Sequence, residues 1–456
     1  MAAIRVAVIG GGISGLGVAY ALQRVGVPFR LIEAAPSAGG MIRSERVNGF
    51  LIEHGPNSAL NASVDVEHVI TDLGLLPDRV FAAPSSRKRY IVKHNHPVAL
   101  PMGLIAFLRT PLWSGRAKAR LLTEPFAAPP PAGEESIASF VSRRLGPEFL
   151  EYAADPFVSG VYAGDPERLS VQATFPKLAA LERNHGGLIR GAIAGIGKPR
   201  APRPRQRGIY SFRDGLGQLP AAISARLGES LWCGARVTAL ARQGDGFRVE
   251  VDRHHERVTF DADQVVIATP ADVAATLTRP FDAGLAEDLA AIEYVPVAVV
   301  ATAFARAAVQ HPLDGFGCLV PRLERRTVLG SLWNSSLFPG RAPEGMVLLS
   351  NFVGGARHAD LVDRSDDELS LLVTADLKRL LGVTDQPTWT RIIRYRRAIP
   401  QYVIGHAARV ERIEHAIAKI PGLSLAGNYL RGVAVGDCLE KGLALGQTLG
   451  TALIKA

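Results

Sequence analysis

Cysteine is scarce in this sequence, and so are the residue clusters that would build a disulfide or metal scaffold. Three cysteines occur in 456 residues, far apart and without a CxxC pair: Cys233, Cys318 and Cys438. This spacing argues against a disulfide framework and a cysteine-based zinc site, and it fits a reducing cytoplasm. The closely spaced histidines are His94 with His96 and His254 with His255. They lack the carboxylate or thiolate frame of a metal site, so we expect no bound metal.

Long apolar runs and targeting segments are also lacking. Apolar residues make up 47% of the chain, yet no run approaches the roughly 18 apolar residues of a membrane-spanning helix. The first predicted strand is entered by about Ile4, which leaves no room for a signal or transit peptide ahead of it. We therefore expect neither a transmembrane helix nor a leader segment.

The sequence also lacks the signatures of a nucleophilic hydrolase and of a nucleic-acid-binding protein. No G-x-S-x-G elbow occurs, and no cysteine and histidine are placed for nucleophilic attack. The net charge of +9 favours an acidic partner, such as an anionic membrane surface or a carboxylate-rich substrate. Because no aromatic-interleaved basic patch is present, we expect no nucleic acid. Chemistry is then expected to come from a cofactor that the protein positions.

The chain opens with a glycine turn of the kind that binds dinucleotides. Residues 6–9 form an apolar run typical of a strand buried on both faces. Three glycines follow in G-x-G-x-x-G spacing: Gly10, Gly12 and Gly15. The first permits the tight turn, the second lets a pyrophosphate approach the backbone, and the third lets the following helix pack on the strand. The start of that helix would direct its N–H groups at the phosphates.

The rest of this unit completes the fingerprint. Apolar residues at helical spacing predict a helix that ends at Gly26, and residues 29–32 predict a second strand. Glu33 follows that strand, where a carboxylate accepts hydrogen bonds from an adenosine ribose and disfavours a 2′-phosphate. The unit therefore predicts an ADP-containing dinucleotide other than NADP, but it does not by itself separate FAD from NAD.

Two stretches near the middle differ from the rest in composition. Residues 101–135 mix Leu, Ile, Phe and Trp with four basic side chains and then break at three prolines. A basic amphipathic segment of this kind can lie in a membrane interface, or it can be a helical insert that packs on its own domain. The sequence leaves both alternatives open. Ser136 is expected to cap the next helix, which Gly146 ends. Residues 190–208 are rich in Pro, Gly and Arg, which indicates a loop.

The second half of the chain predicts mostly strands. Residues 236–240, 247–251 and 258–260 indicate a small antiparallel set, and residues 263–270 a buried strand. Residues 295–395 predict short strands with one helix near 366–381. These patterns make the dinucleotide-binding domain discontinuous, with insertions between its parts.

The C-terminal segment predicts a second helix start at the cofactor. A strand at 423–428 runs into a glycine turn, and the loop 432–436 precedes a helix that continues to the C-terminus. The positive end of that helix would stabilise the negative charge that a reduced flavin gains. The alternative is a helix that only closes the fold.

Several motifs make the chain resemble the flavin-dependent protoporphyrinogen oxidases, in the superfamily that includes amine oxidases and phytoene desaturases. The glycine turn, Gly39-Gly40 and EHGPNS at 53–58 are shared widely in that superfamily. More specific are GVYAGDP at 160–166, SFRDGL at 211–216, GFG at 315–317, AIPQY at 398–402 and GVAV at 432–435. The resemblance covers nearly the whole chain.

The resemblance implies an α/β fold with three parts. A p-hydroxybenzoate-hydroxylase-like FAD-binding Rossmann domain would comprise 1–80, 208–290 and 396–456. A mixed-sheet substrate-binding domain would comprise 81–100 and 291–395, and an α-helical membrane-contact domain would comprise 101–207.

The resemblance also implies the site residues, with non-covalent FAD as the cofactor and no catalytic residue assigned to the protein. FAD would contact Gly10, Gly11, Gly12, Ile13, Ser14, Gly15, Glu33, Ala34, Gly40, Met41, Gly55, Pro56, Asn57, Ser58, Val237, Asn428, Val433, Ala434 and Val435. Family members often carry Trp where Met41 stands, so we expect that contact to be weaker. The substrate pocket would hold Arg89, Gly160, Phe316, Leu319 and Phe352. From the sequence alone Arg89, in a predicted short strand at 88–92, would be interpreted as a surface residue.

The implied reaction is the oxygen-dependent six-electron oxidation of protoporphyrinogen IX to protoporphyrin IX in haem biosynthesis, with release of hydrogen peroxide. The expected partners are the porphyrinogen, molecular oxygen and an anionic membrane at the inner face of the cell membrane, in an otherwise cytoplasmic protein. A homodimer stays open.

Three alternatives also stay open. Coproporphyrinogen III carries four propionates, so its pocket should hold extra cations. An amine oxidase would need an aromatic pair facing the flavin, for which Tyr429 is a poor candidate. The third is a non-catalytic dinucleotide-binding protein.

Overall fold

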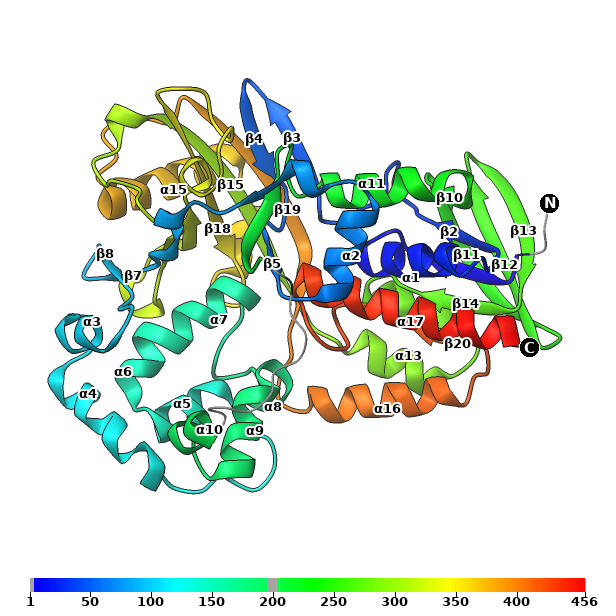
Figure 1. Cartoon of the computed structure of the whole chain (residues 1–456), viewed down its shortest axis with the longest axis horizontal. Helices are drawn as coiled ribbons and strands as arrows, with labels where there is room; N and C mark the ends of the chain where they lie inside the picture. Colours follow the sequence, from blue (N-terminus) through cyan, green and yellow to red (C-terminus); the bar gives the residue numbers. More distant parts are fainter. Residues whose placement is uncertain (1–3, 195–203, 205, 456) are drawn as a thin grey trace.

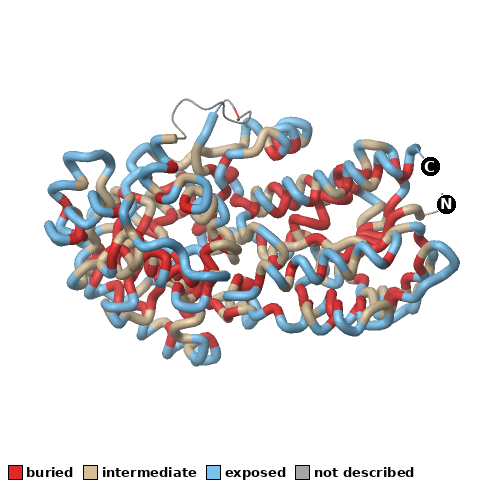
Figure 2. Tube along the Cα trace, turned by 90° about the horizontal axis from the view of Figure 1, so that it is seen from below, coloured by how far each residue is buried: buried red, intermediate tan, exposed pale blue. Residues whose placement is uncertain are grey.

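The computed structural model describes residues 4–194, 204 and 206–455 as an elongated molecule. A parallel sheet and its helices form one end, with both termini, and a seven-stranded sheet and a group of short helices form the other (Figure 1). Buried residues run through the interior of both ends (Figure 2). The prediction of a mixed α/β fold is confirmed at this level.

The parallel sheet has the strand order β10-β2-β1-β14-β20. Its strands come from separate parts of the chain: β1 (Val6–Ile9), β2 (Phe29–Ile32), β10 (Leu231–Trp232), β14 (Gln264–Ile267) and β20 (Leu423–Leu425). Every pairing is parallel, so all the carboxyl ends lie at one edge of the sheet. Strand β1 is buried along its whole length, as its continuous apolar run predicted.

An antiparallel sheet and several helices complete this end of the molecule. The sheet joins β11 (Ala235–Gln243), β12 (Gly246–Arg253) and β13 (Glu256–Ala262), as the sequence predicted. The helices are α2 (Val64–Asp72), α11 (Gln218–Leu227), α12 (Ala271–Thr278), α13 (Ala283–Ala290) and α16 (His406–Ala418).

Helices α1 (Ile13–Arg24) and α17 (Val435–Lys455) pack against each other through glycines. A Cβ atom added at Gly442 would lie 2.3 Å from the Ser14 carbonyl oxygen, and one at Gly446 would lie 2.5 Å from the Val18 oxygen. A Cβ at Gly450 would lie 2.4 Å from a Val25 methyl group. The contacts advance in the same direction along both helices, so the helices are parallel and their N-termini point the same way.

The seven-stranded sheet has the order β19-β15-β18-β17-β16-β7-β8. Its members are β7 (Tyr90–Lys93), β8 (His96–Ala99), β15 (Tyr294–Ala305), β16 (Gly317–Leu319), β17 (Val328–Leu332), β18 (Met346–Gly354) and β19 (Trp389–Pro400). Helix α15 (Asp366–Leu381) packs on it, where the sequence predicted a helix. Three strands are longer than the short strands expected there. Smaller pairings join β3 (Ser44–Val47) to β4 (Phe50–Glu53), and β5 (Ala59–Asn61) and β6 (Arg79–Phe81) to β9 (Gly208–Phe212).

Residues 101–194, which we call the helical segment, hold most of the short helices. They are α3 (Leu104–Arg109), α4 (Gly115–Arg120), α5 (Ile137–Arg144), α6 (Pro147–Phe149), α7 (Asp155–Tyr162), α8 (Val171–Thr174), α9 (Pro176–His185) and α10 (Leu188–Ala194). Two further turns are η3 (Leu121–Phe126) and η4 (Leu150–Ala154). Ser136 caps α5 by accepting a hydrogen bond from the Ser139 N–H, as predicted. Within the described ranges, no helix is both long and apolar enough to cross a membrane.

Two predictions about local structure were wrong. Residues 190–194 belong to α10 rather than to a loop, and the loop predicted from there to 208 falls partly outside the described residues. Arg89 precedes β7 instead of lying within a strand, although its carbonyl accepts a hydrogen bond from the Leu100 N–H at 2.7 Å.

Candidate flavin site

The glycine turn after β1 is tightly packed on one side and open on the other. Gly10 has a φ of +104°, and a Cβ added there would lie 2.7 Å from the Ala268 carbonyl oxygen. A Cβ at Gly15 would lie 1.9 Å from the Gly10 oxygen. At Gly12, by contrast, no described atom lies within 4 Å of the added Cβ. The turn therefore needs Gly10 and Gly15 for its own packing, whereas Gly12 leaves space for an approaching ligand.

Glu33 is fixed at this turn by backbone donors. Its Oε2 accepts a hydrogen bond from the Gly11 N–H at 2.6 Å, and its Oε1 accepts one from the Ala35 N–H at 2.7 Å. Each carboxylate oxygen has a second acceptor position. The half-buried carboxylate can thus hold its place and still accept hydrogen bonds from ribose hydroxyls.

The two glycine-packed helices present their N-termini at different depths along this edge. Ser14, the second residue of α1, lies opposite Gly442, whereas α17 begins at Val435. At about 1.5 Å per residue, α17 therefore extends about 9 Å beyond the start of α1. No described side chain caps α1. Two positive helix ends are thus available to one elongated ligand with negative charge at both places.

The Tyr402 side chain holds the loop before α17 in place. The Tyr402 hydroxyl donates a hydrogen bond to the Asn428 carbonyl oxygen. Burial raises the pKa of Tyr402, so the hydroxyl stays protonated and keeps donating. The His406 ring stacks on Tyr402, with ring centroids 4.4 Å apart and planes at 13°. Burial lowers the pKa of His406 to about 4, which keeps this imidazole neutral.

The EHGPNS motif is tied to the SFRDGL motif by buried charge. Glu53 accepts hydrogen bonds from the Ser44 hydroxyl and from the Leu216 N–H, and its Oε1 lies 3.5 Å from Nη1 of Arg341. Burial raises the pKa of Glu53 against these contacts. Arg341 also donates to the Ser211 hydroxyl at 2.6 Å. The sequence analysis missed Arg341, because nothing in its neighbourhood signals a partner so distant in the chain.

Several other predicted cofactor positions have defined contacts near these groups. A Cβ at Gly55 would lie 2.6 Å from the Met41 carbonyl oxygen, and a Cβ at Gly40 would lie 3.4 Å from Gly12. Asn57 is buried and accepts a hydrogen bond from the Asn334 amide at 2.7 Å. Val237 lies two residues beyond Ala235, whose N–H donates to the Glu33 carbonyl.

The predicted substrate residues form two contacting pairs. The Arg89 guanidinium carbon lies 5.0 Å from the centroid of the Phe316 ring, and the Phe316 N–H donates to the Lys88 carbonyl at 2.8 Å. A Cβ at Gly160, in α7, would lie 2.4 Å from a Leu319 methyl group. The structure therefore brings Arg89 to Phe316 and Gly160 to Leu319.

Phe352 joins this group through a residue that the sequence analysis missed. Leu319 pairs with Gly330 across β16 and β17, and Gly330 pairs with Phe352 across β17 and β18. Directly opposed residues of antiparallel strands point to the same face. Leu319, Gly330 and Phe352 thus form one row, with the glycine leaving space between two apolar side chains. A glycine inside a strand pattern was the available signal.

Comparison with known proteins agrees with this architecture. The family model described as flavin containing amine oxidoreductase matches residues 13–445. Mitochondrial protoporphyrinogen oxidase of Nicotiana tabacum is 35% identical, covering 96% of this chain and 93% of its own. The chloroplastic enzyme of Oryza sativa is 37% identical, over 95% and 85% respectively. Coproporphyrinogen III oxidase of Bacillus subtilis is 30% identical, over 96% of each chain.

Solved structures show the same fold. A crystal structure from Exiguobacterium sp. 255-15 superposes with a TM-score of 0.83 at 26% identity, covering 99% of this chain and 100% of that one. Reduced UDP-galactopyranose mutase superposes with a TM-score of 0.75 at 17% identity, over 98% and 96%, and shows the fold alone. The chain belongs to the flavin-containing amine oxidoreductase family, and within that family it is similar to the protoporphyrinogen oxidases over nearly its whole length.

Proposed function

We propose that the protein oxidises protoporphyrinogen IX to protoporphyrin IX in haem biosynthesis, with non-covalent FAD and with oxygen as the electron acceptor. The observation that carries this proposal is the similarity to six plant protoporphyrinogen oxidases at 33–37% identity, each covering at least 95% of this chain. The contacts of Arg89 with Phe316 and of Leu319 with its neighbours support it, because they supply one cation and apolar side chains for such a substrate.

The residues at the glycine turn fit FAD. Gly12 leaves room for the pyrophosphate, Glu33 offers acceptors to the ribose, and the α17 N-terminus extends toward the flavin end. When bound, FAD accepts the substrate's electrons and passes them to oxygen, which leaves as hydrogen peroxide. Burial raises the pKa of Cys438, the cysteine of the first α17 turn, to about 11. That thiol stays protonated at neutral pH, which supports a non-covalent cofactor.

The chain's own groups would bind and orient the porphyrinogen. The Arg89 guanidinium is exposed beside Phe316 and can grip a propionate with two parallel hydrogen bonds. Leu319 and Phe352 would form the apolar wall against the macrocycle, and Gly160 would let α7 approach it. The positive end of α17 would stabilise the charge that the reduced cofactor gains.

We also propose the division into three parts given by the resemblance. The pairing of β7 and β8 with the seven-stranded sheet supports assigning 81–100 with 291–395 to the substrate-binding part. The long strand β19 ends at Pro400, and the predicted boundary at 395 cuts through it, so this division fits best with that boundary near 400.

We further propose that the helical segment contacts an anionic membrane surface, on the inner face of the cell membrane. Apolar side chains protrude from α3 and its N-terminal loop: Met102, Leu104, Ile105 and Leu108 are 61–73% exposed. Leu122 and Phe126 of η3 are 79% and 81% exposed. Exposed basic residues, among them Arg109, Arg116 and Arg120, accompany them. This combination is typical of interfacial membrane contact.

A paired rate measurement tests the substrate. The purified, flavin-loaded protein is given protoporphyrinogen IX and coproporphyrinogen III separately in air, and the fluorescence of each porphyrin product is followed. We expect faster turnover of protoporphyrinogen IX. Faster turnover of coproporphyrinogen III would support the alternative that the Bacillus subtilis relative represents. Failure of both substrates to reduce the flavin under anaerobic conditions would reject the enzymatic proposal.

A further inference from the structure

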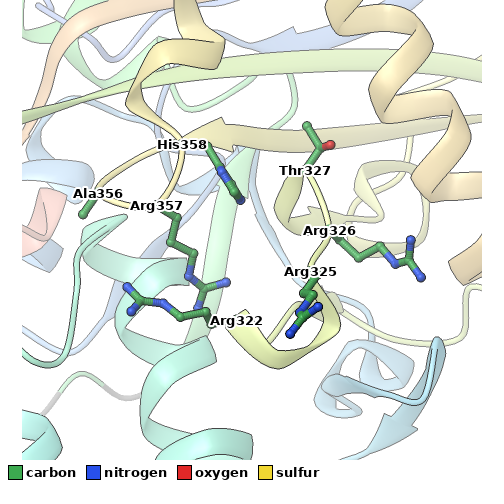
Figure 3. Close-up of a pocket in the computed structure, with 7 residues that line it drawn as sticks. All are labelled: Arg322, Arg325, Arg326, Thr327, Ala356, Arg357 and His358. Atoms are coloured by element: carbon green, nitrogen blue, oxygen red, sulfur yellow. The ribbon is translucent and has the colours of Figure 1, made fainter.

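A cavity of about 480 Å³ lined by arginines lies beside the seven-stranded sheet (Figure 3). Its lining comes from the connection between β16 and β17 and from the turn after β18. The basic side chains are Arg322, Arg325, Arg326, Arg357 and His358, and we call this cavity the arginine pocket. Aspartates already lie against three of the four guanidinium groups: Asp165 pairs with Arg322, Asp155 pairs with Arg357, and Asp376 lies 3.9 Å from Arg326.

Arg357 forms the buried wall of the arginine pocket. Its side chain is 5% exposed and is held by Asp155, Ser159 and the Val320 carbonyl. Its Nε is buried and has no hydrogen-bond partner among the described residues. An unsatisfied buried donor is costly, about 1–3 kcal/mol, but the protein's own atoms cover this N–H, so a ligand in the pocket would meet the neighbouring arginines instead. The Arg322 guanidinium lies next to Arg357 (Figure 3) and donates to Asp165 at 2.8 Å.

The opposite wall carries Arg325 and Arg326, and the two differ in how their side chains are held. The Arg325 side chain makes no hydrogen bond or ion pair with any described residue, and its backbone is left-handed at a φ of +52°. Arg326 donates to the Asn95 side chain, and its Nη1 lies 3.9 Å from Asp376. One oxygen of Asp376 is already taken by the N–H groups of Thr327 and Val328. The nearby carboxylates therefore leave most of the pocket's N–H donors without an acceptor.

We infer that the arginine pocket binds a small molecule that carries two or more oxyanion groups, carboxylate or phosphate. Guanidinium groups bind both kinds of oxyanion with paired hydrogen bonds. Arg322 on one wall and Arg325 on the other keep N–H donors beyond their described contacts, and each can hold one such group. The bound anion would also balance the charge of Arg325, for which the described residues offer no ion pair.

The arginine pocket adjoins the proposed substrate residues through α7. This helix presents Asp155 and Ser159 to Arg357, and Gly160 to Leu319. The oxyanions can therefore belong to a porphyrinogen, as propionates reaching past Leu319, or to a separate small anion. Binding of propionates here rests on the proposed function, whereas binding of a separate anion does not.

Calorimetric titration of the flavin-loaded protein with inorganic pyrophosphate tests the binding site. Loading with flavin fills the phosphate site at the glycine turn, so pyrophosphate cannot be counted there. We expect one molecule bound per chain, with affinity about tenfold weaker in Arg325→Gln, the effect of one lost charge-assisted hydrogen bond. Arg326→Gln should weaken binding less, because its guanidinium is held by Asn95 and is directed away from Arg322 and Arg357 (Figure 3). The control, Arg248→Gln, removes an exposed arginine that pairs with Asp261 on the antiparallel sheet and should change nothing.

The Michaelis constant for porphyrinogen separates the two sources. A rise of about tenfold in KM in Arg325→Gln would assign the oxyanions to the substrate's propionates. An unchanged KM with weakened pyrophosphate binding would assign them to a separate anion. Equal pyrophosphate affinity in all four proteins, or no saturable binding together with unchanged KM in both pocket variants, would overturn the inference. Because the titration needs no turnover, failure of the proposed reaction leaves it readable.

Discussion

The helix pair α1–α17 and the helical segment are held together by different contacts. Between α1 and α17 the contact is backbone against backbone, through Gly442, Gly446 and Gly450. In the helical segment, five charged side chains that are at most 14% exposed join the helices: Glu124, Glu135, Arg143, Arg144 and Glu182. The helix pair has no charged side chain in these contacts, whereas the helical segment combines the charge network with an apolar cluster that includes Trp113 and Phe149.

The charge network works by linking loops and helix ends. Arg144 donates to Glu182 through Nε at 2.7 Å, and Arg143 donates to both Glu182 and Glu135. The Glu124 carboxylate accepts hydrogen bonds from the Leu188 and Ile189 N–H groups, so it caps the start of α10. Such a network fixes orientation between the short helices, in addition to the apolar cluster that they share around Trp113, Phe140 and Phe149.

The difference matches what each region is proposed to do. Helix ends that stabilise charge on a cofactor must be placed accurately, and interlocked backbones give little freedom to shift. The helical segment instead exposes apolar side chains on η3 and α3, so its cohesion cannot rely on burying them. Buried ion pairs supply an orientation without using that surface, although their net contribution to stability can be small.

Breaking the charge network should give the largest effect. Arg144→Ala leaves Glu182 and Glu124 buried with less compensation, which costs about 3–5 kcal/mol in the free energy of unfolding. Denaturant unfolding measures it, and hydrogen exchange should place the loss in α5, α9 and α10. As a control, Arg168→Ala breaks the exposed pair with Glu293 and should cost about 1 kcal/mol or less. Equal costs for the two variants would contradict the role given to the network.

The same contrast explains what the sequence revealed. The glycine turn, Glu33 and the capping Ser136 were predictable because local spacing alone determines them. The partner of α17 was not, since Gly442, Gly446 and Gly450 show a close contact without naming the other helix. Glu124 and Glu182 join residues far apart in the chain, and a charged side chain in a sequence looks the same whether it is buried or exposed.

The strands that were expected to be short show another limit. Polar residues at Thr302 and Asn351 resemble strand ends, yet both are buried inside long strands. The Asn351 amide donates to the Thr302 hydroxyl at 3.0 Å and to the Val300 carbonyl at 2.9 Å, so both of its N–H donors are paired within the sheet. The neighbouring contact of Arg89 with Phe316 was expected only through family resemblance, because β7 and β16 lie more than 200 residues apart in sequence.

The second-largest effect should be an acid sensitivity on the flavin side. Burial lowers the pKa of His406 from 6.5 to about 4. A depressed pKa means that this group's contribution is fully present above about pH 6.5 and is lost as the pH falls through about 4. At about 1.4 kcal/mol per pKa unit the contribution is of the order of 3 kcal/mol. His406→Phe should keep the stacking on Tyr402 and flatten the fall in stability between these pH values.

The measurement is the free energy of unfolding as a function of pH, with flavin retention followed in parallel. His415→Phe, on the exposed side of the same helix, is the matched control and should keep the wild-type profile. The helical segment has its own acid limit. Burial acts to raise the pKa of Glu182, but hydrogen bonds from Arg143 and Arg144 prevail and lower it below its ordinary 4.5. Its contribution is thus present above about pH 4.5 and is lost at lower pH. An identical profile in wild type and His406→Phe would remove the role given to this histidine.

Substitution of Arg89 should affect substrate binding without affecting either the helix pair or the helical segment. Loss of a charge-assisted bond to a propionate costs about 1.5–3 kcal/mol, so Arg89→Ala should lower kcat/KM about 10- to 150-fold, mainly through KM. Flavin content and stability should stay unchanged, because Arg89 is exposed and touches neither the glycine-packed helices nor the charge network. Steady-state kinetics check this. A normal KM with a collapsed kcat would show that Arg89 orients the reacting carbon instead.

Overpacking the helix pair should give an effect of about 1–3 kcal/mol. The added side chain in Gly446→Val meets the Val18 carbonyl at 2.5 Å and has to push α17 away from α1. We expect lower stability and faster loss of flavin on dilution, with the charge network intact by hydrogen exchange. Gly284→Ala, at a helical glycine whose added Cβ would meet only a side-chain atom at 3.4 Å, is the control and should not destabilise. Full flavin retention in Gly446→Val would separate helix spacing from cofactor binding.

The smallest effect concerns the surface that the charge network supports. Each basic residue near an anionic membrane contributes about 1 kcal/mol, so Arg109→Gln should weaken binding to anionic vesicles about fivefold. Arg236→Gln removes an equal charge from the antiparallel sheet at the other end of the molecule and should leave binding unchanged. Co-sedimentation at low and high salt measures both, and salt should reduce the binding because it screens surface charge. If both variants bind alike, net charge rather than the helical segment drives the attraction. If the wild type binds neither neutral nor anionic vesicles at low salt, the exposed apolar side chains of α3 and η3 serve another contact, and the contrast between the two regions reduces to one of packing alone.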